Sequence, residues 1–302
     1  MGTYNVYVGE VAMDEYYRAG RWPGLSDKEE VVSLGAVPGG TIANAACVSA
    51  ALGVDTRFCV VMNKSATSRA LLEDLNAHGI NTDLVVFDED LPDPKTMIFL
   101  VGDENTIFIP TPNKMPIIDL TPEQLEVLGN AQYLYGTADS LLCMRCGSLK
   151  GEELLAECRS MGAKVAVDFD VNAVGNGTLQ IDLLFLNEAG FANTCSGLSP
   201  EETLEDLFAR GVEMVVVTRA EKGCDIYTPE DSFHQEARQV PVVDAVGAGD
   251  TFCSSFISVL EEMGPVKAAT FATAAASICI QGMGPRSGAV SRDEVEAVLA
   301  QM

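Results

Sequence analysis

Short apolar runs alternate with segments of helical pattern through much of the chain. Three of these runs, Val165–Val167, Leu183–Leu186 and Met214–Thr218, are uniformly hydrophobic, as expected of parallel strands that are covered on both faces. Helical patterns span Leu149–Met161 and Pro200–Arg210. The alternation predicts an α/β fold with a doubly wound, mostly parallel sheet flanked by helices, and ligands bound beyond the carboxyl ends of its strands.

Two segments interrupt this alternation. Met97–Val101 and Thr106–Ile109 flank a polar turn, which is typical of an antiparallel hairpin. Residues Glu15 to Val37 contain several glycines and are interpreted as a long irregular excursion after the first strand. We expect the two segments to build a small β lid over one edge of the sheet.

The chain shows no low-complexity linker and no internal repeat. We therefore expect a single domain over residues 1–302, with lid insertions at about 15–37 and 93–112. The strand edges of such a lid could pair two copies of the chain, so a homodimer through the lid is a further expectation.

Charge narrows the partners that this chain can bind. Its 302 residues include 44 acidic and 19 basic side chains, a formal net charge of −25. Such a surface repels nucleic acid and anionic membranes, so neither is expected as a partner. A polyphosphate would have to be held by helix N-termini and a metal ion.

The cysteines and the N-terminal sequence favour a cytoplasmic location. Nine cysteines are scattered without a disulfide-like rhythm, which is typical of a reducing compartment. The first residues carry neither a basic region nor a long apolar one. Cys143 and Cys146 form an isolated CxxC, which we interpret as two helical thiols rather than a redox or zinc site.

The most informative chemistry lies in Asp244–Phe252, with the sequence Asp-Ala-Val-Gly-Ala-Gly-Asp-Thr-Phe. The glycines predict a sharp loop that opens a helix, whose N–H groups and dipole favour an anion such as phosphate. Asp250 is placed to take the proton of an attacking hydroxyl. An N-capping aspartate after a glycine turn is the alternative. Because no Gly-Lys-Ser/Thr follows, a P-loop is not implied.

The full run resembles the C-terminal signature of the ribokinase/PfkB family of carbohydrate and nucleoside kinases. The resemblance implies a ribokinase-like fold and an ATP-dependent phosphotransferase that acts on an alcohol group. It also implies that Asp250 is the base and that the backbone of residues 245–249 forms the anion hole. The catalytic residues that it implies are Asp250, Gly247, Ala248 and Gly249.

Two segments near the N-terminus resemble the sugar-binding part of this family. Gly39–Ala46 is similar to the signature whose Gly-Gly turn and Asn contact sugar hydroxyls, although a plain strand-to-helix turn would use the same residues. Gly9–Asp14 resembles the first strand and the aspartate after it. The substrate-binding residues implied are Asp14, Gly39, Gly40, Asn44 and, from a looser match, Asp139.

Further segments resemble the nucleotide side. Val217–Gly223 is similar to the family's nucleotide-binding strand and turn, with Ala220 in place of a usual glycine, and Gly282–Ala289 resembles the loop beside the adenine pocket. The residues implied to bind ATP are Asn187, Thr218, Gly223, Gly249 and Gly282.

The resemblance also implies Mg²⁺. Asn187–Gly190 matches an Asn-x-x-Glu motif except that Gly190 replaces the glutamate that holds magnesium through water. Glu188 remains as a candidate for a water-mediated contact, and a cation held through phosphates and waters needs few protein ligands. We therefore expect weakened rather than abolished binding. Related kinases bind K⁺ through backbone carbonyls, which here implies Asp244 and Val246, and the sequence leaves this site open.

The substrate is open as well. Asp168–Asn172 resembles a family segment whose arginine serves acidic sugars, and that arginine is missing, which favours a small neutral sugar. Tyr16, Tyr17 and Trp22 could instead stack on a base, so an adenosine-like nucleoside kinase is the alternative. A non-catalytic sugar- or nucleotide-binding regulator on the same fold is another, supported by the altered Asn-x-x-Glu motif.

Overall fold

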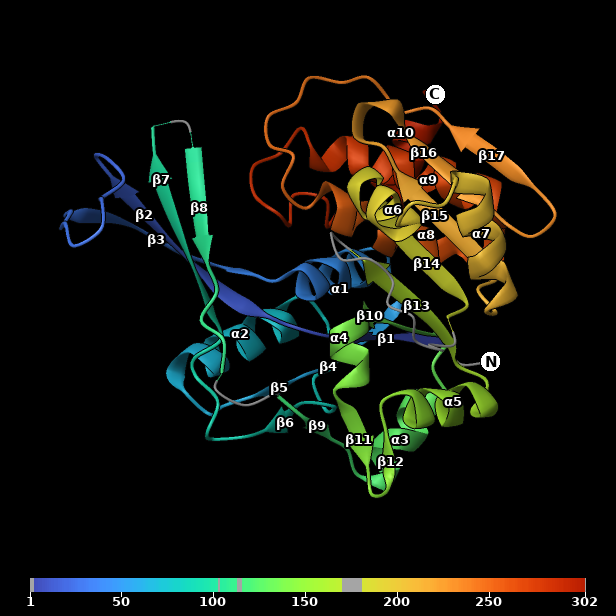
Figure 1. The fold of residues 1–302 in the computed structure, drawn as a ribbon, viewed down its shortest axis with the longest axis horizontal. Coiled ribbons are helices and arrows are strands. Elements are labelled where there is room, and N and C mark those ends of the chain that lie inside the picture. Colours follow the sequence, from blue (N-terminus) through green and yellow to red (C-terminus); the bar gives the residue numbers. More distant parts are fainter. Residues whose placement is uncertain (1–2, 103, 113–115, 170–180, 302) are drawn as a thin grey trace.

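A computed structural model describes residues 3–102, 104–112, 116–169 and 181–301. An eight-stranded sheet with the order β17-β16-β15-β14-β13-β10-β1-β4 runs through its centre (Figure 1). Neighbours from β4 to β15 are parallel, and β16 and β17 extend one edge in antiparallel fashion. The strands are β1 (Tyr4–Val8), β4 (Asp55–Cys59), β10 (Tyr133–Thr137), β13 (Lys164–Phe169), β14 (Leu183–Asn187), β15 (Met214–Thr218), β16 (Cys224–Tyr227) and β17 (Ser232–Gln235).

The uniformly apolar runs are central strands, as predicted. On β15, Val215 and Val217 pack into the core on one face of the sheet, whereas Val216 packs into the core on the other face. Because both faces are covered, these strands need no polar alternation. The structure thus confirms the doubly wound, mostly parallel α/β fold.

Helices cover the two faces in two groups. One face carries α1 (Thr41–Ala51), α2 (Ala66–Ala77), α8 (Ala248–Met263), α9 (Pro265–Cys279) and α10 (Arg292–Leu299). The other carries α3 (Pro122–Gly129), α4 (Ala138–Leu142), α5 (Glu152–Met161), α6 (Glu188–Cys195) and α7 (Pro200–Ala209). Short elements complete the description: β5 (Val61–Met62) with β6 (Val86–Phe87), β9 (Ile118–Asp119) with β11 (Met144–Cys146) and β12 (Leu149–Lys150), and a 3₁₀ turn at Ala220–Lys222.

A separate four-stranded sheet projects from one side of the molecule (Figure 1, left). Its order is β3-β2-β7-β8, and we call it the lid sheet. It consists of β2 (Ala12–Ala19), β3 (Val31–Gly39), β7 (Lys95–Val101) and β8 (Glu104–Phe108). The predicted hairpin is confirmed, since β7 and β8 pair in antiparallel fashion.

The interpretation of residues 15–37 as irregular is wrong. Most of this segment forms the antiparallel strands β2 and β3, with a bulge in their pairing at Tyr16/Tyr17. Gly35, which suggested a loop, has φ 105° at this bulge. A bulge needs a residue that tolerates such a backbone conformation, so the glycine serves a strand rather than a loop.

Two local predictions need correction. Leu149 and Lys150 form β12, and Gly151, with φ 50°, separates them from α5, so the helix begins three residues later than expected. Cys143 is the C-cap of α4 and Cys146 lies in β11, so these thiols are not both helical. Among the described residues, no helix is long and apolar enough to span a bilayer.

Candidate active site

Parallel strands bring three of the predicted site residues to the side of the central sheet where the strands have their carboxyl ends. Asp139 follows the carboxyl end of β10, while Asn187 and Thr218 are the last residues of β14 and β15. The chain leaves β1 at Val8 and enters the lid sheet, where Asp14 lies near the start of β2. We call Asp14, Gly39, Gly40, Asn44 and Asp139 the sugar-side residues, and Asn187, Glu188, Thr218, Gly223 and Gly282 the nucleotide-side residues.

The Gly-Gly pair is required by close packing at the base of the lid sheet. A Cβ on Gly39 would overlap the Asp14 carboxylate, and Gly40, with φ 98°, would place a Cβ 2.9 Å from the carbonyl oxygen of Glu10. Partial burial raises the pKa of Asp14, opposed by a hydrogen bond from Thr96 and the nearby charge of Arg286. The two glycines thus let β3 pass directly beside the Asp14 carboxylate.

Asn44 and Asp250 meet although 206 positions separate them in sequence. Asn44 lies on α1 and is only 5% exposed. Its Nδ2 donates to Asp250 Oδ2 at 3.1 Å. The N-cap of α8 is Gly247, so Asp250 sits inside the first helical turn. The alternative that Asp250 is merely an N-cap is therefore wrong.

The loop that leads into α8, residues 244–247, contacts the loop at residues 282–289. A Cβ on Gly247 would overlap the carbonyl oxygen of Pro285, so the loops approach at backbone distance. Asp244 Oδ1 accepts from the Val246 N–H and Oδ2 from the Gly284 N–H, both at 3.0 Å. Asp244 therefore already uses both oxygens to join these loops.

Arg286 was not singled out by sequence reasoning. Its Nε donates to Asn44 Oδ1 at 3.2 Å, and its Nη1 pairs with Asp74 of α2. Its side chain is 13% exposed. Within the described part of the chain, its buried Nη2 has no hydrogen-bond partner. The available clue was its place as the basic residue of the segment 282–289; nothing in the sequence pointed to Asp74.

The nucleotide-side residues are less buried than Asn44. Asn187 and Thr218 are register partners on β14 and β15. Asn187 caps α6 by accepting from the Gly190 N–H at 2.7 Å. Gly223 has φ 93°, and a Cβ there would overlap the carbonyl oxygen of Gln235.

Glu188 is held between two cations. Its Oε1 lies 3.3 Å from Arg219 Nη1 and 3.4 Å from Lys222 Nζ, and its side chain is 54% exposed. Arg219 also pairs with Asp225 of β16. Since exposed ion pairs are weak, Glu188 remains able to turn to a hydrated cation, so it fits a water-mediated magnesium contact. The described residues include no cluster of three or more His, Cys, Asp or Glu side chains suited to bind a metal directly.

Three further positions from the sequence analysis have local surroundings of their own. Asp139 is exposed in the first turn of α4, and Gly282 packs against Ser287 of its own loop. Asp168 accepts a hydrogen bond from the Tyr135 hydroxyl at 2.6 Å. Residues 170–172 of the segment that resembles the family's sugar-binding motif lie outside the described residues.

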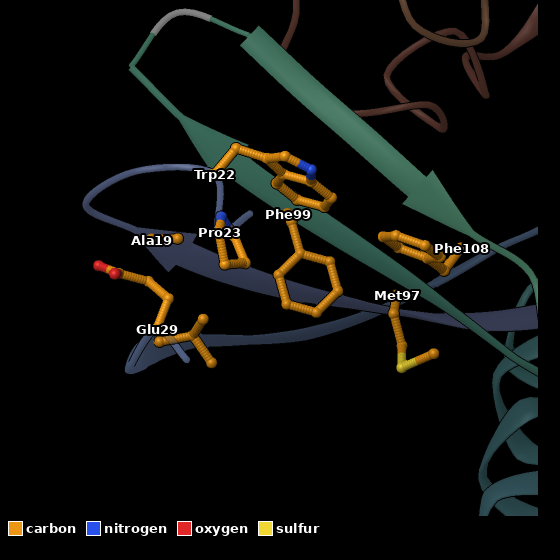
Figure 2. Close-up of a pocket in the computed structure, with 8 residues that line it drawn as sticks. Ala19, Trp22, Pro23, Glu29, Met97, Phe99 and Phe108 are labelled. Atoms are coloured by element: carbon orange, nitrogen blue, oxygen red, sulfur yellow. The ribbon is translucent and has the colours of Figure 1, made fainter. Parts of the chain in front are cut away.

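The three lid aromatics do not share a face. Side chains alternate along β2, so Tyr16 lies on the same face of the strand as Asp14, and Tyr17 lies on the other face. Burial raises the pKa of Tyr16, and the nearby charges of Asp14 and Asp244 raise it further. Tyr17 stacks on Phe99 with ring centroids 5.2 Å apart, and Trp22 stacks on Phe108 at 5.9 Å. Figure 2 shows Trp22, Phe99 and Phe108 gathered around one hollow of the lid sheet. Only Tyr16 of the three is therefore placed to cover the site.

Known proteins share both this sequence pattern and this architecture. A family model described as pfkB family carbohydrate kinase matches residues 2–292. A ribokinase from Bacillus subtilis is 26% identical over 97% of this chain and 98% of its own length. Fructokinase-2 of Oryza sativa subsp. japonica is 25% identical over 73% of this chain and 70% of its own length.

Solved structures have the same fold. Ribokinase of Arabidopsis thaliana complexed with ribose and ATP superposes with a TM-score of 0.84, at 23% identity over 99% of both chains. A nucleoside kinase of Methanocaldococcus jannaschii gives 0.74, at 20% identity over 100% of both. A putative ribokinase II from E. coli in complex with ATP and Mg²⁺ gives 0.76, at 17% identity over 100% of both. From the family match along most of its length, and with a ribokinase-like fold, the chain belongs to the pfkB family of carbohydrate kinases.

Proposed function

We propose that this kinase transfers the γ-phosphoryl group of ATP to a hydroxyl of a small neutral sugar, with Asp250 as the general base. The observation that carries the proposal is the hydrogen bond from Asn44 to Asp250. It joins the motif expected to hold the sugar to the motif expected to hold the phosphate. A hydroxyl bound beside Asn44 would therefore lie next to the carboxylate that takes its proton.

The start of α8 supports a role in binding the transferring phosphate. Sixteen residues of helix follow Gly247, so the dipole and the N–H groups of Ala248 and Gly249 favour negative charge at this end. Phosphoryl transfer depends mainly on positioning and on neutralising charge at the phosphate oxygens. We assign this anion hole to the backbone of residues 245–249.

The nucleotide-side residues would hold ATP. Asn187, Thr218, Gly223, Gly249 and Gly282 keep their proposed contacts with the nucleotide, and ATP appears with related folds in the Arabidopsis and E. coli complexes. Mg²⁺ would neutralise charge on the phosphates, with Glu188 reaching it through water. Dependence on ATP favours the cytoplasm as the site of action.

A potassium site at Asp244 and Val246 stays a prediction. Both Asp244 oxygens already accept backbone hydrogen bonds, so a cation there would rely on carbonyl oxygens. Comparing turnover in potassium, sodium and tetramethylammonium salts at equal ionic strength would test it.

The lid sheet bears on the choice of substrate. Tyr17 and Trp22 stack on neighbouring lid residues away from Asp14, which leaves Tyr16 as the aromatic group placed over the site. This arrangement supports a sugar more than a base clamped between aromatic rings. An adenosine-like nucleoside remains the second candidate substrate because the Methanocaldococcus nucleoside kinase has the same fold.

The decisive experiment measures ADP production with a panel of neutral pentoses, hexoses and nucleosides. We expect turnover with one or a few sugars and none with nucleosides. Turnover with a nucleoside alone would replace the proposed substrate class. Binding of several ligands without turnover of any would favour a non-catalytic regulator.

We further propose that the chain forms a homodimer through the lid sheet. Trp22 and Phe108 are 49% and 43% exposed in the hollow of Figure 2, and β3 and β8 are the outer strands of the sheet. A second copy related by a two-fold axis would cover the same apolar patch on each subunit. In sedimentation velocity, Trp22→Ser should shift the protein to monomer. Phe87→Ser, at an exposed residue outside the lid sheet, should not; a monomeric wild type would contradict the proposal.

A further inference from the structure

Four side chains from four separate segments form a continuous row that ends at the proposed base. Asp74 on α2 pairs with Arg286 Nη1, and Arg286 Nε donates to Asn44 Oδ1 at 3.2 Å. Asn44 Nδ2 then donates to Asp250 Oδ2 at 3.1 Å. Asn44 is 5% exposed, and the side chains of Arg286 and Asp74 are 13% and 23% exposed. The row therefore runs through the interior from α2 to the start of α8.

The chemistry of the row determines how the Asn44 amide is oriented. A guanidinium has donors only, and an ionised carboxylate has acceptors only. Asn44 must therefore turn its carbonyl oxygen to Arg286 and its NH₂ group to Asp250. Both neighbours favour the same orientation, and without the guanidinium this row would oppose a flip of the amide only through repulsion between the amide oxygen and the Asp250 carboxylate.

We propose that Arg286 is a positioning residue of the phosphotransfer site, which fixes the Asn44 amide so that it donates to Asp250, and that Asp74 holds Arg286 in place. This inference rests on the proposed role of Asp250 as the base. By keeping a donor on Asp250, Arg286 stabilises the ionised carboxylate that must accept the hydroxyl proton.

Three other groups near Asp250, among the residues that the structure describes, add no positive charge. Burial raises the pKa of Tyr135 on β10 and of Cys253 on α8 well above their usual values, so both remain neutral and neither adds positive charge. Asp168 on β13, hydrogen-bonded to Tyr135, adds negative charge. Arg286 brings a positive charge to this acidic group, and that charge also opposes the burial that raises the pKa of Asp14.

The first test compares Arg286→Met with Arg286→Lys. Met removes both donors and the charge, whereas Lys keeps a charged donor. We expect Arg286→Met to lower kcat about ten- to a hundredfold with little change in the KM for the sugar. The acid limb of its kcat profile should move to higher pH by about one unit, because a carboxylate that loses a donor binds its proton more tightly.

Controls separate positioning from folding. Arg286→Lys should recover most of kcat and the wild-type pH profile. Arg292→Met removes an arginine that pairs with Glu262 on the outer surface, and it should change neither. A Met variant with unchanged kcat and an unchanged acid limb would overturn the inference.

A double variant covers the case in which Asp74, left buried without its partner, destabilises the protein. Asp74→Met with Arg286→Met removes both charges together, and such replacements are often well tolerated. The folded double variant should still show the shifted acid limb. If it titrates like the wild type, Arg286 serves stability alone and the inference fails.

A measurement without turnover distinguishes this inference from the proposed function. With ¹⁵N-labelled asparagine, the Asn44 side-chain amide signal should titrate with pH, because its NH₂ group donates to the Asp250 carboxylate, which gains a proton as the pH falls. Asp250→Asn should abolish this titration, and Arg286→Met should raise its midpoint by about one unit. An unmoved midpoint overturns the positioning role even if sugar turnover is confirmed. A moved midpoint sustains it even if no sugar is turned over.

Discussion

On the sugar side of the proposed site, Asn44 is hydrogen-bonded to both Asp250 and Arg286. On the proposed nucleotide side, Glu188 is half exposed, and its contacts to Arg219 and Lys222 are 3.3 and 3.4 Å long. The first arrangement orients its side chains through hydrogen bonds to a buried amide, whereas the second leaves an exposed side chain able to turn to another partner. A base must be held within a fraction of an ångström of the reacting hydroxyl, but a hydrated cation tolerates mobile ligands.

A substitution should therefore have different effects on the two sides of the proposed site. A buried group that loses its partner bears the full cost of desolvation, whereas an exposed ion pair contributes about 0–1 kcal/mol. Changes on the sugar side should therefore lower turnover steeply, and changes on the nucleotide side should shift apparent affinities modestly.

The largest effect is expected from Asp250→Asn. The amide cannot accept the hydroxyl proton, so kcat for the sugar identified by the ADP assay should fall by about two to four orders of magnitude. Asp293→Asn is the matched control, since Asp293 lies in the first turn of α10 as Asp250 does in α8. Turnover by Asp250→Asn at the wild-type rate would show that Asp250 is not the base.

Gly39→Ala should have the next largest effect. The added methyl group would overlap the Asp14 carboxylate, which must then move away from its present position. We expect kcat/KM for the sugar to fall about a hundredfold, as is typical when a site group is displaced by about 1 Å, with the KM for ATP little changed. Gly24→Ala adds the same methyl group to open space in the lid segment and should behave like the wild type. An equal loss in both variants would show that the lid segment is merely sensitive to alanine.

Glu188→Gln should have the smallest effect of the three. Removing the charge that would contact hydrated Mg²⁺ should raise the half-saturating Mg²⁺ concentration up to about fivefold, as expected for a contact of about 1 kcal/mol at an exposed site. The readout is kcat against free Mg²⁺ at saturating sugar, with Glu205→Gln on the exposed surface of α7 as the control. A loss of a hundredfold or more would mean that Glu188 is fixed in the site as firmly as the sugar-side residues.

Local patterns predicted the parts of this molecule that local physics determines. The strands β13, β14 and β15 follow from uniformly apolar runs, and the β7–β8 hairpin from two strand-like runs on either side of a polar turn. The turn that ends at Gly247 and opens α8 followed from its glycines. Where a single residue type serves two structures, prediction failed: Gly35 suggested a loop and instead accommodates a bulge.

Long-range relations were beyond the sequence. The contact of Asn44 with Asp250 joins residues far apart in the chain; resemblance to a family implied a role for each residue but did not predict their contact. The pairing of Arg286 with Asp74 had no local signature, because an ion pair between a loop and a helix face leaves no periodic pattern. Which lid aromatics face the site also depended on strand register, which the sequence did not define.

The path of the chain from β1 into the lid sheet has a consequence for how such enzymes can change. Asp14 lies on β2. Gly39, which leaves room for the Asp14 carboxylate, lies on β3. Part of the proposed sugar site therefore belongs to the same structural unit as the lid. A lid exchanged between relatives, in nature or by grafting, would bring its own Asp14 carboxylate with it and leave the proposed base behind on α8. Substrate preference and phosphate chemistry could then be inherited separately.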